Sequence, residues 1–301
     1  MNEGKLDGRK NGKVCYDYRD NIVVDRDSPI LAFKANRDRY SPKDNTKIYG
    51  GMPLLGSIHS EDAMTWNVFR TMHKDNRLRL MNDLFEEELA GAQMLLWTYA
   101  VSDDRQSAEL QYTVGNAIRM LDGRHDRKQI TEPDVILVTK KSFIVCEAKL
   151  GEEGKCNHLW SNSKDKKTGQ DSPGPALRYD DYFVNNENPF RKGVAKDDEM
   201  YSKNAYQLFR MAFYSYHIAA KLKLQPKLIS LTNETWWNVE KDNPREVSSQ
   251  TWAQFRERIE PGKLFCKNIF WQDIWLSLHC KNPAKARQIL SNGRSSAPPA
   301  V

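Results

Sequence analysis

The sequence predicts an α/β protein in which helices flank a mixed β-sheet. Apolar residues recur at helical spacing in HSEDAMTWNVFRTM and again in NAYQLFRMAFYSYHIAAKLKL. Between these stretches lie DVILV and SFIVCEA, short apolar runs that are typical of strands. Only a short polar turn separates the two runs, which predicts an antiparallel hairpin. A further strand, PKLISLTN, follows the second helical stretch, and this alternation of helices and strands is typical of a layered α/β structure.

The composition fits a folded, water-soluble protein. Of the 301 residues, 39% are hydrophobic and 29% are charged, enough apolar material for one large domain or two small ones. No apolar run approaches the roughly 20 residues of a membrane helix, and MNEGKLDGRKNGK lacks the apolar core of a secretory signal. The five cysteines are widely spaced and none forms a CxxC pair, which indicates a reduced, cytoplasmic protein. The net charge of +6 is compatible with binding a polyanion but does not by itself indicate one.

Composition shifts along the chain predict a central core with additions at both ends. The first part is rich in Gly, Asp, Asn and Pro, and its one apolar patch, NIVVDRDSPILAF, could pair as a strand or cover a sheet edge. The predicted parts are an N-terminal arm (1–56), a core (57–235) with a long polar insertion (151–203), a C-terminal strand and helical part packed on the core (236–290), and a disordered tail (291–301).

The first predicted helix has a clear start signal. Ser60 is a suitable N-cap, and Glu61 and Asp62 suit the positive end of the helix dipole. A stripe at three-residue spacing predicts the buried face: Ala63, Trp66, Phe69 and Met72. A second helix is predicted in LMNDLFEEELAGAQMLLWTYA.

Three consecutive strands are predicted next, in ELQYTVGNAIRML, DVILV and SFIVCEA, with Lys140 and Lys141 in the turn of the hairpin. The following helix has apolar or small residues along one side: Ala205, Leu208, Ala212, Tyr216 and Ala219. After the strand PKLISLTN, the stretches TWAQFRERIE and IFWQDIWLSLH predict amphipathic helices.

Charged residues interrupt the apolar pattern at one end of the hairpin. Because side chains alternate along a strand, Glu147 and Lys149 share a face at the end of FIVCEAKL. Asp134 follows Pro133 at the start of the partner strand, and Glu132 shares its side. A tight turn between the strands brings Asp134 close to Glu147 and Lys149, so two carboxylates and an ammonium are predicted to converge.

Such a cluster suits Mg²⁺ or Mn²⁺, hard cations that prefer oxygen ligands and bind phosphate directly. A bound metal lowers the pKa of its water and neutralises charge on a phosphodiester. A neighbouring lysine can orient or deprotonate the attacking water, or stabilise the pentavalent phosphorane. The Pro-Asp dipeptide and the Glu-x-Lys pattern are each common on surfaces, and the cluster could instead be a surface salt-bridge network. The combination on two joined strands is more specific.

Pro133-Asp134 and Glu147-Ala148-Lys149 resemble the motif of the PD-(D/E)xK nuclease superfamily, over roughly residues 57–235. The resemblance implies a restriction-endonuclease-like fold, with a central mixed sheet and an αβββαβ core. It implies that Asp134 and Glu147 bind Mg²⁺, for which Mn²⁺ can substitute. It also implies that the backbone carbonyl of Ala148 is a further ligand and that Lys149 is the catalytic lysine.

Members of this superfamily often add an acidic residue from the helix before the sheet, and Glu61 is the candidate for catalysis and metal binding. The alternative reading of Glu61 is simple capping of the helix dipole. The other acidic candidate is the run from Glu86 to Glu88, which as a charge run is more typical of a solvated helix face.

The helix after the sheet often carries a glutamine or a basic residue facing the site. Gln207 and Arg210 are three apart on one helix face and could position the water or contact a phosphate. The alternative is a polar rim on a packed helix. Met211 stands where RecB-like members, with a Q-x-x-x-Y pattern, have tyrosine. Three lysines of the insertion are candidate phosphate contacts, or else part of a solvated loop: Lys164, Lys166 and Lys167.

The sequence therefore predicts a Mg²⁺-dependent DNA endonuclease of restriction or defence type, with no membrane partner. Two alternatives stay open: a nucleic-acid-binding module with the same fold but no cleavage, and an RNA or structure-specific nuclease. Since cutting both strands of a duplex usually needs two sites, a homodimer is also an expectation.

Overall fold

The computed structural model describes residues 15, 17–38, 52–57, 60–122, 132–149, 187–194, 206–232 and 252–279. Within these residues, six strands form one sheet in the order β2-β1-β3-β4-β5-β6. The sheet contains antiparallel and parallel pairs, which confirms the predicted α/β fold class. The chain divides into two compact units. The first unit is Met1–Arg77 with Gln93–Ile136, and the second is Leu78–Ala92 with Leu137–Val301.

The helix α2 of the first unit begins where the sequence predicts. Ser60 accepts a hydrogen bond from the backbone N–H of Ala63 and caps α2 (Glu61–Thr65). The helix continues through a π-helical turn, η3 (Trp66–Arg70), into α3 (Thr71–Lys74). The predicted stripe is confirmed, since each of its side chains is at most 2% exposed: Ala63, Trp66, Phe69 and Met72.

The N-terminal apolar patch forms helices and not the strand that the sequence suggested. It contains the end of η1 (Tyr18–Asn21) and most of α1 (Pro29–Arg37), and η2 (Leu54–Gly56) lies between α1 and α2 in the chain. Ser28 caps α1 and Pro29 occupies its first turn, where a missing N–H costs nothing. These start signals outweigh the β-branched residues of the patch.

The predicted strand at Glu109–Leu121 is wrong, because this segment belongs to the helix α5 (Arg105–Leu121). Asp104 caps α5 by accepting from the N–H of Ser107 at 2.9 Å. The buried residues follow the i, i+3, i+4, i+7 spacing of one helix face: Ser107, Leu110, Val114, Ala117, Ile118 and Leu121. The β-branched and aromatic composition suggested a strand, but the spacing of the apolar residues determines the structure.

The long helix predicted over LMNDLFEEELAGAQMLLWTYA is also wrong. This segment contains the end of η4 (Leu78–Met81), then α4 (Asn82–Phe85), β1 (Gln93–Leu96) and β2 (Tyr99–Ala100). Left-handed backbone at Glu86 (φ 50°) and Gly91 (φ 71°) interrupts the helix. Trp97 and Thr98, with φ of 50° and 70°, form the turn of the antiparallel β1–β2 hairpin.

The second unit contains the parallel part of the sheet. Thr139 donates its N–H to the carbonyl of Ser142 at 3.0 Å, which closes the predicted turn between β3 (Val135–Val138) and β4 (Ser142–Ala148). The predicted helix and strand that follow are confirmed as α7 (Tyr206–Leu222) and β5 (Gln225–Thr232). Both β4–β5 and β5–β6 are parallel pairs.

The predicted C-terminal helices are confirmed in part. TWAQFRERIE is helical over residues 252–257, and α9 spans Trp271–His279. Ile269 and Phe270, which the prediction placed in that last helix, instead end the strand β6 (Phe265–Phe270). None of the helices in the described part of the chain combines the length and apolar character that a membrane crossing needs.

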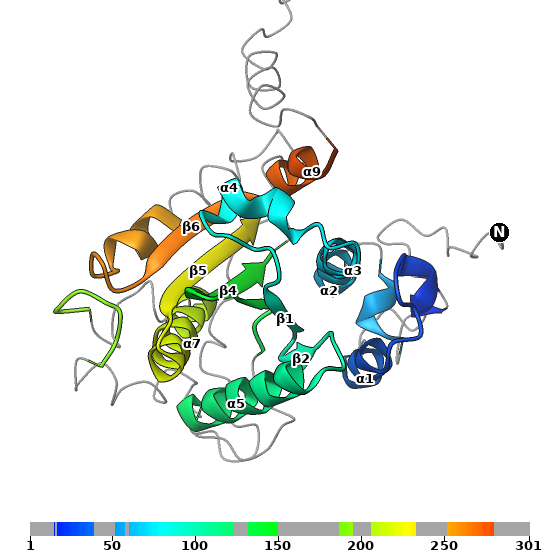
Figure 1. Ribbon diagram of the computed structural model, residues 1–301, viewed down its shortest axis with the longest axis horizontal. Coiled ribbons are helices and arrows are strands. Elements are labelled where there is room, and N and C mark those ends of the chain that lie inside the picture. The colour runs from blue at the N-terminus through cyan, green and yellow to red at the C-terminus, as the bar shows by residue number, and fades with distance from the viewer. Residues whose placement is uncertain are drawn as a thin grey trace, which may run out of the picture. The chain divides into compact units, whose positions relative to one another are not determined.

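The register of the parallel strands decides which side chains share a face. Ile144 is the partner of Lys227, and Glu147 is the partner of Ser230. The Lys227 face meets the segment after α4, because Lys227 Nζ donates to the carbonyl of Glu86 at 2.6 Å. By alternation Glu147 points to the other face. The helix α7 packs against β4 and β5 (Figure 1).

Candidate active site

Glu147 and Lys149 lie together at the carboxyl end of β4, as predicted. Lys149 Nζ donates to Glu147 Oε1 at 2.8 Å, and the two side chains are only 10% and 4% exposed. The N–H of Lys149 also donates to the carbonyl of Leu231 at 2.8 Å, so the ladder with β5 extends one residue beyond β4. This extra hydrogen bond keeps Lys149 in strand geometry and therefore on the same face as Glu147.

The ion pair has two chemical consequences. Burying a carboxylate is costly unless a cation accompanies it, and the ammonium of Lys149 supplies that cation. An ammonium carries hydrogen-bond donors and no acceptor, so Lys149 in this pair can donate to an oxygen but cannot take a proton. The pair therefore brings an acceptor group and a donor group together at the end of one strand.

The donor set fits part of a magnesium site. The carboxylate of Glu147 and the backbone carbonyl of the next residue, Ala148, are hard oxygen ligands on adjacent residues. Mg²⁺ commonly takes only one or two carboxylates and completes its shell with water. Among the described residues, no three side chains of His, Cys, Asp or Glu are grouped as ligands for one ion.

The first turn of α7 is level with Glu147. Ser215 Oγ donates to the carbonyl of Lys227 at 2.9 Å, and Lys227 is the register partner of Ile144. From Ile144 to Glu147 the strand advances by about 10 Å. Because α7 connects two parallel strands, β4 and β5, it runs in the direction opposite to them. With a rise of about 1.5 Å per residue, about seven residues of the helix cover the same 10 Å. The corresponding helical residue is Leu208, in the turn that contains Gln207 and Arg210.

Gln207 and Arg210 are both polar groups in buried surroundings. Arg210 is 4% exposed, and its Nε donates to the hydroxyl of Tyr214 at 2.8 Å. The Oε1 atom of Gln207 is buried, and none of the described residues donates a hydrogen bond to it. A buried acceptor of this kind calls for a partner such as water or a ligand.

Two neighbours of these residues were not anticipated from the sequence. Tyr214 follows Arg210 by four residues, so helical i,i+4 spacing could have identified it. Ser230 is the register partner of Glu147 on β5 and is 3% exposed. Its identification needs the register between β4 and β5, which a single sequence does not provide.

Asp134 and Glu61 belong to the first unit. Asp134 immediately precedes β3 and is half-buried, and its backbone carbonyl accepts from the N–H of Trp97 at 3.2 Å. Glu61 is the first residue of α2 and is also half-buried. The prediction that both residues join Glu147 in one metal site stays a prediction.

Glu87 does not lie on a solvated helix face, in contrast to the prediction for the run of three glutamates. It follows α4, its side chain is 7% exposed, and it accepts from Ser142 Oγ at 2.5 Å. Ser142 begins β4, whereas Glu147 is five residues further along, about 16 Å away in an extended strand. Glu87 is therefore a structural residue at the opposite end of β4 and is no candidate ligand beside Glu147.

Lys164, Lys166 and Lys167, the predicted phosphate contacts, lie outside the described residues.

One comparison with known proteins identifies a family. A family model described as "Restriction Endonuclease associating with ARP" matches residues 5–288 of this chain. No curated protein and no solved structure matches this chain.

Proposed function

The chain belongs to the family of restriction endonucleases associating with ARP, and from this premise we propose that it is a metal-dependent endonuclease that hydrolyses phosphodiester bonds of DNA. Family membership itself indicates a nuclease of restriction type. The observation that supports the finer proposal is the buried Glu147–Lys149 pair at the end of β4. It has the residue types and the spacing of the PD-(D/E)xK motif, on the strand that follows the Pro-Asp hairpin strand.

In this proposal the oxygen ligands come from both strands of the hairpin. Glu147 and the carbonyl of Ala148 would hold the metal from β4, and Asp134 from the residue before β3. The proposal requires that antiparallel pairing, counted outward from the turn that Thr139 and Ser142 close, brings Asp134 beside Glu147. Glu61 would complete the shell from the start of α2. When bound, Mg²⁺ neutralises charge on the scissile phosphate and lowers the pKa of a coordinated water.

The second-unit residues have distinct roles in hydrolysis. Lys149 donates to the attacking water or to a phosphoryl oxygen, since its ammonium has no acceptor. The buried Oε1 of Gln207 accepts a hydrogen bond from the water and thereby orients a lone pair toward phosphorus. The water oxygen bonds to phosphorus and gives up a proton to solvent, the bond from phosphorus to the leaving oxygen breaks, and that oxygen takes up a proton from solvent. Arg210 is a candidate contact for a neighbouring phosphate.

The proposal is tested by incubating the full chain with supercoiled plasmid, linear DNA and single-stranded RNA. Each substrate is combined with Mg²⁺, Mn²⁺ or EDTA. We expect cutting of DNA with either metal and none in EDTA. Cutting of RNA alone would replace the DNA proposal with an RNA nuclease, and binding of DNA without cutting would support the binding-module alternative.

Variants assign the residues. Asp134→Ala, Glu147→Gln and Lys149→Ala are each expected to abolish cutting while the protein stays folded by circular dichroism. The matched control is Glu109→Gln, which removes an exposed carboxylate paired with Arg105 on α5. Metal-dependent cutting that survives both Asp134→Ala and Lys149→Ala would refute this site.

A further inference from the structure

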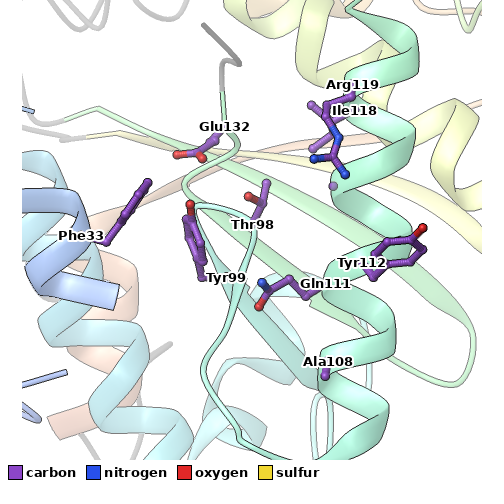
Figure 2. A pocket seen from close by; sticks show the side chains of 10 residues that line it. Phe33, Thr98, Tyr99, Ala108, Gln111, Tyr112, Ile118, Arg119 and Glu132 are labelled. Carbon is purple, nitrogen blue, oxygen red and sulfur yellow. The ribbon is translucent and has the colours of Figure 1, made fainter. Parts of the chain in front are cut away.

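A pocket of the first unit is the right size for one aromatic ring. It has a volume of about 140 Å³ and lies between α1, the β1–β2 turn, α5 and the residue before Pro133 (Figure 2). An apolar protein cavity of about 150 Å³ can hold benzene. The pocket therefore accommodates a six-membered ring but is small for a fused bicyclic one.

The walls of the pocket combine aromatic faces with polar groups. Phe33 of α1 and Tyr99 of β2 contact each other with ring centroids 5.2 Å apart, and Phe33 is 44% exposed. Figure 2 shows Gln111 extending from α5 toward Tyr99. Gln111 Oε1 accepts from the N–H of Ala100 at 2.7 Å, and this contact fixes the amide so that its NH₂ group is a donor of set orientation.

Glu132 supplies the acceptor. Arg37 Nη1 lies 2.7 Å from Oε2 of Glu132, and the Glu132 side chain is only 9% exposed. A carboxylate offers about four lone-pair sites, so Glu132 can accept a further hydrogen bond from a ligand N–H. An aromatic wall with one fixed acceptor and one fixed donor matches a planar heterocycle that has both an amino group and a carbonyl at its edge.

Gly115 lines the pocket, and packing does not explain why this position is a glycine. It lies inside α5, where glycine is less favourable than alanine. A Cβ atom built on Gly115 would meet no atom within 4 Å, and its backbone is not in the left-handed region. Neither close packing nor backbone conformation therefore requires glycine here. The Cβ position of Gly115 instead faces open space in the pocket.

The turn beside the pocket holds an unfavourable conformation. Thr98 lines the pocket with φ of 70°, a left-handed conformation that is costly for a β-branched residue. The preceding residue, Trp97, anchors the turn: its ring stacks on Trp66 at 5.9 Å, and Lys34 Nζ lies 4.8 Å from its centroid. The N–H of Trp97 donates to the carbonyl of Asp134 at 3.2 Å, so this turn directly contacts the candidate metal ligand.

We propose that this pocket receives one unstacked pyrimidine base of the nucleic acid substrate. Tyr99 and Phe33 stack on the ring, Glu132 accepts from an exocyclic amino group such as N4 of cytosine, and Gln111 donates to the ring carbonyl. The pocket then adds a base contact beside the candidate catalytic aspartate. The inference rests on the proposed function, because it takes nucleic acid as the substrate.

The test places the base directly. A ten-nucleotide DNA strand with one 5-iodocytosine is bound to the full chain in EDTA, irradiated, and mapped by mass spectrometry. We expect the cross-link in the peptide of Phe33 or Tyr99. Gly115→Leu fills the pocket and is expected to lower the cross-link yield about tenfold, as for loss of one stacked base. The matched control Thr113→Leu lies on the same helix away from the pocket and keeps the wild-type yield.

Three results would overturn the proposal: cross-links confined to other peptides, an unchanged yield in Gly115→Leu, or equal competition by deoxycytidine monophosphate at the concentration of the strand. The last result would assign the pocket to a free nucleotide. Because EDTA prevents cleavage, the outcome is separate from that of the nuclease proposal. A Glu147→Gln protein that cuts nothing still gives the cross-link, and an active nuclease that fails this test refutes the pocket alone.

Discussion

The described residues of the second unit include two buried glutamate–lysine pairs that have different roles. Glu147 and Lys149 lie 2.8 Å apart with side chains 4% and 10% exposed. Glu87 and Lys227 lie 3.0 Å apart, each with its side chain 7% exposed. Their distance and burial are nearly the same, so neither quantity distinguishes a catalytic pair from a structural one.

The surroundings distinguish them. Lys227 also donates to the carbonyls of Phe85 and Glu86, and Glu87 accepts from the hydroxyls of Ser142 and Thr139. This pair therefore joins the segment after α4, the hairpin turn and β5, which are far apart in the sequence. Glu147 and Lys149 are two residues apart on one strand, so their ion pair joins no distant segments. We therefore expect that ion pair to matter less to the fold than the Glu87–Lys227 pair does.

The largest expected effect comes from removing the charges of the Glu147–Lys149 pair. The double variant Glu147→Leu with Lys149→Met should cut plasmid at least about 1,000-fold more slowly in Mg²⁺. Its free energy of unfolding should be unchanged or higher, because replacing a buried ion pair with apolar side chains is often neutral or stabilising. Urea denaturation and a plasmid cleavage time course measure the two quantities. A destabilised protein would show that this pair also supports the fold.

Removing one member of the structural pair, Glu87–Lys227, should instead lower the stability of the protein. Lys227→Met leaves the Glu87 carboxylate buried without its cation, and we expect a loss of about 3–5 kcal/mol in the free energy of unfolding. Lys267→Met is the matched control, since it removes an ion pair with Glu86 whose side chain is 56% exposed. That control should cost less than about 1 kcal/mol. Equal losses in the two variants would contradict the importance of burial here.

The pH dependence of stability should separate Glu87 from a solvated glutamate. Burial alone would raise the pKa of Glu87, but hydrogen bonds from Ser142, Lys227 and Thr139 outweigh it and lower the pKa. A lowered pKa in the folded state means that the stabilisation is present above the ordinary glutamate range, near pH 4.3, and is lost as the pH falls through the folded-state pKa.

Denaturation of wild type and Glu87→Gln between pH 7 and pH 3 measures this contribution. The difference in their free energies of unfolding should be largest at pH 7 and shrink toward pH 3. A constant difference would show that the charge of Glu87 is not what stabilises the turn.

The same contrast explains what the sequence could predict. The Glu-x-Lys spacing, the hairpin around Lys140 and the helix α7 all follow from local periodicity, and the structure confirms them. The Glu87–Lys227 pair connects residues far apart in the sequence, so no local pattern could reveal it. The β1–β2 hairpin escaped prediction because Trp97 and Thr98 form its turn without the glycine or asparagine that usually marks left-handed backbone. The helix α5 was not predicted, because its β-branched and aromatic residues suggest a strand whereas the spacing of its apolar residues is helical.

The smallest expected effect tests whether the separation of stability from function extends to the first unit. Gly115→Ala should raise the free energy of unfolding by up to about 1 kcal/mol, because alanine is the better helix former and its Cβ meets no atom within 4 Å. The same Cβ narrows the pocket, so capture of 5-iodocytosine should fall, though less than in Gly115→Leu. A protein that is both more stable and weaker at capturing the base would show that the glycine is retained for binding. Greater stability with full capture would leave the glycine without a functional reason, since the pocket would then tolerate the methyl group.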